Sequence, residues 1–457
     1  MIATTGPYPL RDVHMPTWLL RFDEHGACTS PATRAQLLDK VRAESPTDII
    51  VFAHGWNNDF DDAAGMYAEL LQRFEAACAD HPPQRAFKPL FIGLVWPSIW
   101  LSFDNGPDIA AGGLADRAQT VLTELAQRVA ATSGPTGLER VYALLAAPGI
   151  DDADAAELAR LIAPAFGLMA DEGAATQGRN TVADDVLAMM RAMDAAAPGA
   201  TPAPNDGGDD DDFSRKADAP QGMPAPGDAQ VAGLLAKLDP RIALRLFSLY
   251  QMKDRAGTVG FHGVSALLRE LLAIAGPRVH AIGHSFGCKV QLSALCAQPL
   301  PRPVASLLLL EPAVSHLCFA DAVAGTGQPG GYRAALSAER VTPPIFSTYS
   351  RNDGPLHDTF HLAVRRAADL GEVQIAADPD STSAGAPPSP FAALGGYGPR
   401  RAGQVLVDPL PAAGADFALP PGNPAIVAFD GSSGAIKGHG DITGPQVAWA
   451  LHRLVFR

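Results

Sequence analysis

The sequence has few cysteines, a deficit of basic residues and no long apolar run. Its 457 residues include five cysteines and no C-x-x-C pair, so we expect neither a disulfide framework nor a structural zinc site. A reduced, cytoplasmic compartment is the simplest interpretation. The first 16 residues lack the apolar centre of a signal peptide, and no run approaches the ~20 residues of a membrane-spanning helix. We therefore expect no transmembrane segment.

Negative charge dominates the composition. There are 49 acidic and 35 basic residues, and the formal net charge is −14. This balance argues against nucleic acid or an anionic membrane as the partner. Hydrophobic residues make up 47% of the chain, which is enough for a large buried core. The sequence gives no indication of the oligomeric state.

The acidity is concentrated in one internal region. Residues 151–230 contain 16 acidic and five basic residues. Within this region, residues 195–230 are rich in Ala, Pro, Gly and Asp, a composition that predicts a disordered acidic linker. We therefore predict a core made of residues 1–131 and 256–457 and a helical insert at 132–255. The helices of the insert are either a packed layer or a lid over a binding site.

Outside the insert, apolar runs that are typical of buried strands alternate with helical patterns. Residues 48–53 (DIIVFA) show the continuous β-branched and aromatic character of a strand buried on both faces. Such alternation predicts an α/β fold with a mostly parallel central sheet flanked by helices. The predicted strands are 18–22, 48–53, 90–95, 278–282, 305–310, 345–349 and 425–429. The predicted helices are 31–41, 61–78, 115–130, 264–275, 286–297, 356–370 and 444–455.

One strand-to-helix junction carries a motif with chemical meaning. Gly283–Gly287 reads G-H-S-F-G and fits G-x-S-x-G, the pattern of a serine nucleophile exposed on a tight turn. We predict Ser285 as the nucleophile and the N–H of Phe286 as one donor to an oxyanion. The His-Gly-Trp sequence after strand 48–53 suggests a second donor, the N–H of Trp56. The His54 side chain is interpreted as structural.

A serine nucleophile needs a base and a carboxylate that orients the base. The chain order Ser, Asp, His selects Asp353, after strand 345–349, and His439 in a glycine-flanked loop. Glu311, after strand 305–310, is the alternative acid. The other late histidines are interpreted as surface or helix-terminal residues: His357, His361 and His452. We expect no metal and no cofactor.

These residues resemble the α/β-hydrolase superfamily. The resemblance rests on His54–Trp56, the Trp96-Pro97-Ser98 run, the elbow Gly283–Gly287, Asp353 and His439. It covers about 1–131 and 256–457 and leaves the insert unmatched. It implies an eight-stranded, mostly parallel sheet and a Ser/Asp/His triad, and it does not supply a substrate.

The function that these features favour is a serine hydrolase acting on a carboxylic ester, similar to esterases and lipases. The substrate would be a small-molecule or lipid-like ester. An amidase, peptidase or thioesterase uses the same triad and stays open. The alternative from another class is a non-catalytic binding protein that retains the fold.

Overall fold

The structure is a computed structural model of the chain. It describes residues 6–56, 58–98, 114–166, 183, 186–187, 189–191, 238–323, 329–360, 392–417 and 424–457. The predicted linker at 195–230 and His361 lie outside these residues. The chain divides into two compact units, one made of residues 1–99 and 252–457 and the other of residues 100–251.

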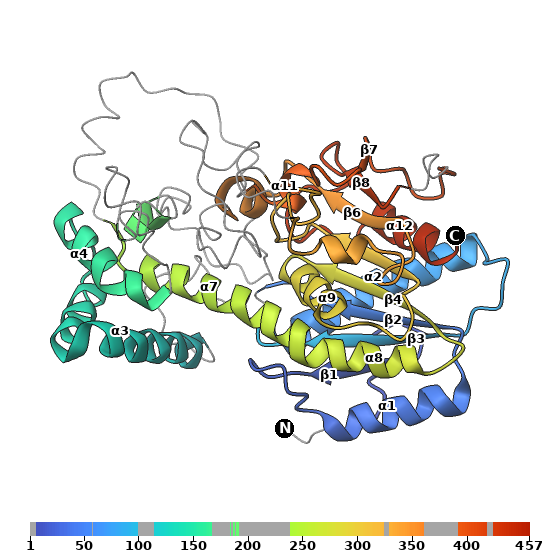
Figure 1. The fold of residues 1–457 in the computed structure, drawn as a ribbon, viewed down its shortest axis with the longest axis horizontal. Coiled ribbons are helices and arrows are strands. Elements are labelled where there is room, and N and C mark those ends of the chain that lie inside the picture. Colours follow the sequence, from blue (N-terminus) through green and yellow to red (C-terminus); the bar gives the residue numbers. More distant parts are fainter. Residues whose placement is uncertain are drawn as a thin grey trace. The chain divides into compact units, whose positions relative to one another are not determined.

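The first unit is built on an eight-stranded sheet in which every neighbouring pair is parallel (Figure 1). The strand order is β1-β3-β2-β4-β5-β6-β8-β7. The strands are β1 (Thr17–Arg21), β2 (Asp48–Ala53), β3 (Pro89–Val95), β4 (Arg278–His284), β5 (Ser306–Leu310), β6 (Ile345–Tyr349), β7 (Val405–Val407) and β8 (Ile426–Asp430). The predicted parallel α/β sheet is confirmed. β7 was not predicted, because a three-residue, partly exposed edge strand carries almost no pattern.

Helices cover both faces of this sheet (Figure 1). On one face, α2 (Phe60–Asp80) packs against α12 (Pro445–Val455), and both contribute to a core shared with β2, β3, β6 and β8. On the other face, α9 (Phe286–Ala297) packs on β4 and β2 and contacts α8 (Ser265–Ala273). An ion pair between Arg34 and Glu270 at 2.9 Å joins α1 (Pro31–Glu44) to α8. The central strands are therefore buried on both sides, as their unbroken apolar runs predict.

Side-chain hydrogen bonds differ at the starts of α2 and α1, and one helix contains a π-helical turn. Asp59 caps α2 by accepting from the N–H groups of Asp61 and Asp62, while Asp62 accepts from the N–H of Asp59. Ser30 precedes α1 but does not cap it with its side chain, because Ser30 Oγ accepts from the N–H of Arg21 on β1 instead. A π-helix, η3 (Val259–Val264), precedes α8.

The loops after β5 and β6 contain short helical turns. These are η4 (Arg333–Leu336), η5 (Pro355–Thr359) and α11 (Leu394–Tyr397). The helix predicted at 356–370 corresponds to the π-turn η5 and Phe360, and its remainder lies outside the described residues.

No helix within the described ranges is both long and apolar enough to cross a membrane.

The second unit is helical in its described part. It contains α3 (Leu114–Leu145), α4 (Asp152–Ile162), the turn η1 (Ala163–Phe166) and the beginning of α7 (Ile242–Thr258). Helix α3 is interrupted at Gly134, whose φ of 69° precedes Pro135, and this break explains why the sequence pattern predicts a shorter helix. Arg140 joins α3 to α4 through Asp154 and Glu157, each at 2.7 Å.

A buried charged network ties together the amino-terminal ends of β2 and β4. Asp48 is fully buried and accepts two hydrogen bonds of 2.8 Å from the guanidinium of Arg85 and one of 3.0 Å from Arg278. It also bonds His280 Nε2 at 3.0 Å, while His280 Nδ1 bonds Ser306 Oγ of β5 at 2.7 Å. Burial alone would disfavour the charge of Asp48, but the bonds from His280 and the arginines outweigh burial and hold its pKa well below the usual range.

We expect Asp48→Asn to lower the free energy of unfolding by about 3 kcal/mol, because it breaks a buried charge pair whose arginines are partly exposed. The stabilisation is fully present above the ordinary carboxyl pKa of about 4 and is lost as the pH falls below it. The difference between wild type and variant should therefore shrink in acid. Urea unfolding at several pH values measures it. The exposed Asp39→Asn is the control and should cost under about 0.5 kcal/mol. Equal effects of both changes would contradict this role for Asp48.

Candidate active site

Ser285 occupies a strained turn between β4 and α9. Its φ is 54° and its ψ is −123°, a conformation that non-glycine residues rarely adopt and that concentrates at functional sites. Its N–H donates to the carbonyl of Leu310 at 3.0 Å, and its own carbonyl accepts from the N–H of Cys288 at 3.0 Å. These bonds fix the side chain above the carboxyl end of the sheet.

The glycines on both sides of Ser285 are required by close backbone contacts. A Cβ on Gly283 would lie 2.6 Å from the backbone of Cys288, and one on Gly287 would lie 2.0 Å from the carbonyl oxygen of Ala53. Neither position therefore has room for a side chain. The second contact brings α9 directly against the end of β2.

Ser285, His439 and Asp353 form one hydrogen-bonded chain. His439 Nε2 lies 2.9 Å from Ser285 Oγ, and His439 Nδ1 lies 2.7 Å from Asp353 Oδ2. A neutral imidazole satisfies both contacts when Nδ1–H donates to the carboxylate and Nε2 accepts from the hydroxyl. The structure thus brings together the three residues that sequence analysis selected, and all three are buried.

The loops after β6 and β8 hold Asp353 and His439 in place. Ser350 Oγ and Asn352 Nδ2 both donate to the carbonyl of Ile436, each at 3.0 Å. Asp353 Oδ1 accepts from the N–H of Leu356 at 2.9 Å. The residues after β6 therefore anchor the turn that leads to His439 and fix the carboxylate at the same time.

His284 is a further site residue, which the sequence analysis did not single out. Its Nε2–H donates to the carbonyl of His439 at 2.9 Å, so the residue before the nucleophile holds the loop of the base. Burial, followed by the neighbouring His439, keeps its pKa well below the ordinary value. The signal available in the sequence was the histidine inside G-H-S-F-G.

His54 joins the His-Gly-Trp and Trp-Pro-Ser sequences. Its Nδ1–H donates to the carbonyl of Gly55 at 2.8 Å, and its Nε2 accepts from the N–H of Trp96 at 3.3 Å. The Trp96 indole donates back to the His54 carbonyl at 2.9 Å, and Ser98 Oγ donates to the carbonyl of Asn58 at 3.0 Å. Burial lowers the pKa of His54 to about 4, so this histidine is neutral and structural, as interpreted from the sequence.

The two residues predicted to supply oxyanion donors lie beside the nucleophile. Phe286 is the first residue of α9, where the helix offers its N–H no carbonyl partner. The Trp56 ring packs edge to face against His439, with centroids 5.3 Å apart, and against Phe286 at 6.1 Å. The side chains thus place aromatic surface next to Ser285. The role of the two N–H groups stays a prediction.

Glu311 follows β5 and also lies in this site. Its φ is 44°, its side chain is fully buried, and no N–H group or hydroxyl of the described residues donates to its carboxyl oxygens. Burial and then the charge of Asp353 raise its pKa well above the ordinary value. The carboxylate in contact with His439 is therefore that of Asp353.

Three side chains in the described part of the chain have the spacing of a metal-ion site. These are His284, Glu311 and His439, and one ligand atom from each lies within 4.8 Å of the others. His439, however, has both ring nitrogens engaged by Asp353 and Ser285. An ion here would have to compete with those bonds, and the absence of a metal stays a prediction.

The other histidines considered from the sequence are separate from this chain of bonds. The His357 ring stacks on Tyr397 with centroids 4.4 Å apart. His452 lies in the last turn of α12 and bonds the carbonyl of His81 at 2.9 Å. Of the two predicted settings, surface and helix-terminal, His452 has the second, since it is buried in the last turn of its helix.

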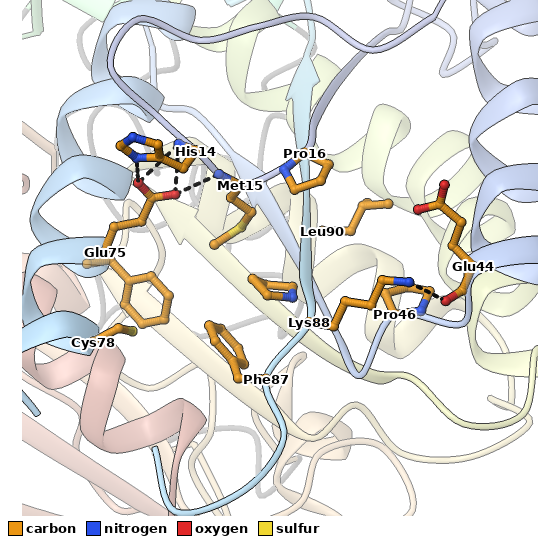
Figure 2. Close-up of a pocket in the computed structure, with 12 residues that line it drawn as sticks. His14, Met15, Pro16, Glu44, Pro46, Glu75, Cys78, Phe87, Lys88 and Leu90 are labelled. Atoms are coloured by element: carbon orange, nitrogen blue, oxygen red, sulfur yellow. Dashed lines mark hydrogen bonds and ion pairs between the residues drawn. The ribbon is translucent and has the colours of Figure 1, made fainter. Parts of the chain in front are cut away.

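A pocket of about 410 Å³ lies at the opposite edge of the sheet, around the starts of β1, β2 and β3. Figure 2 shows Glu75 bonded to the backbone N–H groups of His14 and Met15, and Lys88 bonded to the Glu44 carbonyl. Burial raises the pKa of Cys78 in its wall to about 12. Since this thiol stays protonated and the carboxylate of Glu75 is already bonded, the pocket offers no activated nucleophile.

Residues 29–154 match a family model described as "Alpha/beta hydrolase of unknown function (DUF900)". The matched segment includes His54–Trp56 and Trp96–Ser98 and ends before Ser285. Comparisons with curated proteins and with solved structures found no match. The parallel sheet, the strand-to-helix elbow and this match agree with the α/β-hydrolase fold that the sequence predicts.

Gly287→Ala should destabilise the protein by at least about 1–3 kcal/mol, because the new methyl group would collide with backbone that has no free space. The control is Gly65→Ala in α2, where a Cβ meets nothing within 4 Å and where alanine should stabilise the helix by up to about 1 kcal/mol. Thermal and urea unfolding of both variants tests this. Wild-type stability in Gly287→Ala would show that α9 and β2 are not in the close contact described.

Proposed function

We propose that the protein is a serine hydrolase that cleaves a carboxylic ester through an acyl-enzyme. The observation that carries the proposal is the chain from Ser285 Oγ to His439 Nε2 at 2.9 Å and from His439 Nδ1 to Asp353 Oδ2 at 2.7 Å. It is supported by the strained conformation of Ser285 and by its position at the start of α9, whose dipole favours negative charge. A serine that merely capped this helix would not need a buried base and carboxylate.

In the proposed reaction, Ser285 Oγ attacks the substrate carbonyl while His439 Nε2 takes the hydroxyl proton. Asp353 keeps Nδ1 protonated and stabilises the imidazolium that forms. The N–H groups of Phe286 and Trp56 donate to the oxyanion. His439 then returns the proton to the leaving alcohol, and a water molecule releases the acyl group by the reverse sequence.

The substrate is proposed to be a small-molecule or lipid-like ester. The Trp56 ring packs against both His439 and Phe286, and the Phe360 ring lies next to Phe286, with centroids 6.4 Å apart. An apolar acyl group is therefore accommodated better than a charged one. A cytoplasmic location is also proposed, because none of the five cysteines, which all lie in the described ranges, forms a disulfide bond.

Ser285→Ala should remove essentially all turnover and leave the fold intact, since it deletes one hydroxyl at a turn and opens no core cavity. Hydrolysis of p-nitrophenyl esters and the thermal unfolding midpoint measure the two effects. Ser293→Ala is the matched control: it lies on the same helix α9, and its hydroxyl bonds Tyr332 instead of the site. Activity of Ser285→Ala within tenfold of wild type would reject this nucleophile.

The substrate class is separated by a panel of p-nitrophenyl esters with increasing acyl length, matched thioesters and peptide amides. We expect the highest kcat/KM on an ester with an apolar acyl chain. Preferential cleavage of amides or thioesters would assign the same triad to another hydrolase class. No turnover of any substrate, with wild-type folding, would favour the binding-protein alternative.

A further inference from the structure

Glu311 follows the strand that lies between the strands preceding Ser285 and Asp353. This strand is β5. It pairs on one side with β4, which ends directly before Ser285, and on the other side with β6, which precedes Asp353. Its N–H donates to Thr348 Oγ1 of β6 at 3.1 Å, and its φ of 44° is a conformation unfavourable for glutamate. The backbone is therefore held in a strained turn that directs a carboxyl group into the site.

The surroundings of this carboxyl group decide its charge. It is fully buried, no N–H group and no hydroxyl of the described residues donates to either oxygen, and one oxygen lies within 4.8 Å of ring nitrogens of both His284 and His439. Its contact with Asp353 joins two carboxyl groups, so a hydrogen bond between them requires a proton on one of the two. The other titratable groups that act on it are Asp353 and Asp441, and Cys288 responds to it in turn. Both aspartates are acidic, and His284 is held neutral by burial. An unsolvated carboxylate beside these groups would be strongly disfavoured, so Glu311 keeps its proton.

Asp353 is in the opposite situation. Its two oxygens accept from the Leu356 N–H at 2.9 Å and from His439 Nδ1–H at 2.7 Å. Two neighbouring buried carboxyl groups share a site poorly when both are ionised, and hydrogen bonds decide which one carries the charge. The charge therefore resides on Asp353 and the proton on Glu311.

We propose that Glu311 is a second, protonated acid of the active site, which ionises and orients His439 when Asp353 is removed. This inference rests on the proposed function for its kinetic consequence, but the protonation of Glu311 does not. Glu311 is a positioning residue in this account: it acts on His439 and does not touch the substrate. Burial and the charge of Asp353 together keep Glu311 neutral, and removal of Asp353 takes away the second of these causes.

A double-mutant cycle tests the replacement, with kcat/KM on an activated ester for wild type, Glu311→Gln, Asp353→Ala and the double variant. We expect Glu311→Gln to lose less than tenfold in the wild-type background and at least about tenfold in the Asp353→Ala background, because coupled neighbours are not additive. The Asp353→Ala enzyme should show an ionisation in its pH profile that the double variant lacks. Asp353→Asn, which keeps the side-chain volume, replaces Asp353→Ala if the latter does not fold.

The matched control is Asp441→Asn in the same Asp353→Ala background, because Asp441 is also acidic and lies in the loop of His439. It should cause no comparable further loss. Equal losses from Glu311→Gln in both backgrounds would indicate a structural role and overturn the proposal. A loss on the order of 10⁴ from Glu311→Gln alone would make Glu311 the orienting acid itself and would also overturn the proposal. Replacing the orienting aspartate of a serine protease by asparagine has an effect of about this size.

Infrared difference spectra between wild type and Glu311→Gln at neutral pH measure the proton directly and require no turnover. We expect the carbonyl band of a protonated carboxylic acid to disappear in the variant. Loss of the paired bands of a carboxylate would contradict the inference. A protein that shows the acid band but hydrolyses no substrate would retain the protonated Glu311 and reject the proposed function alone.

Discussion

The active-site geometry depends on one close backbone contact, between the start of α9 and the end of β2. Gly287 lies so near the carbonyl of Ala53 that no side chain fits between them. This contact turns the chain sharply at Ser285 and fixes its left-handed φ of 54°. The same contact places the His54–Trp56 backbone beside the nucleophile. The parallel sheet then brings the residues after β5, β6 and β8 to the same edge, because the carboxyl ends of parallel strands meet there.

The described residues include two buried, hydrogen-bonded chains of aspartate, histidine and serine, at opposite ends of the sheet. Asp353, His439 and Ser285 lie at the carboxyl edge, and Asp48, His280 and Ser306 lie at the amino edge. In the second chain Arg85 and Arg278 neutralise Asp48. Its serine, Ser306, belongs to β5 and lies opposite His280 in the regular pairing of β5 with β4. Three hydrogen-bonded residue types are therefore weak evidence for a catalytic site when taken alone. The strained turn at Ser285, at the start of α9, distinguishes the first chain.

The sequence allowed the sheet and most of its helices to be predicted, because fully buried strands and amphipathic helices have strong patterns. The elbow was predictable because G-x-S-x-G lies between a strand pattern and a helix pattern, which is the context that this motif requires. Asp353 and Glu311 could not be separated by pattern alone, since both follow central strands. The hydrogen bonds of Leu356 and His439 to Asp353 separate them, and such contacts depend on how distant loops pack. The bond from His284 to the His439 carbonyl was missed for the same reason, because it joins residues 155 positions apart.

The most direct test of the central claim is covalent labelling with a fluorophosphonate, followed by peptide mapping of the modified residue. Such a reagent reacts with a serine activated by a neighbouring base and mimics the acylation step. The account predicts a single adduct on Ser285, formed by the wild-type protein and absent from a His439→Ala variant that still folds. Labelling of another residue, or equal labelling of Ser285 without His439, would contradict it.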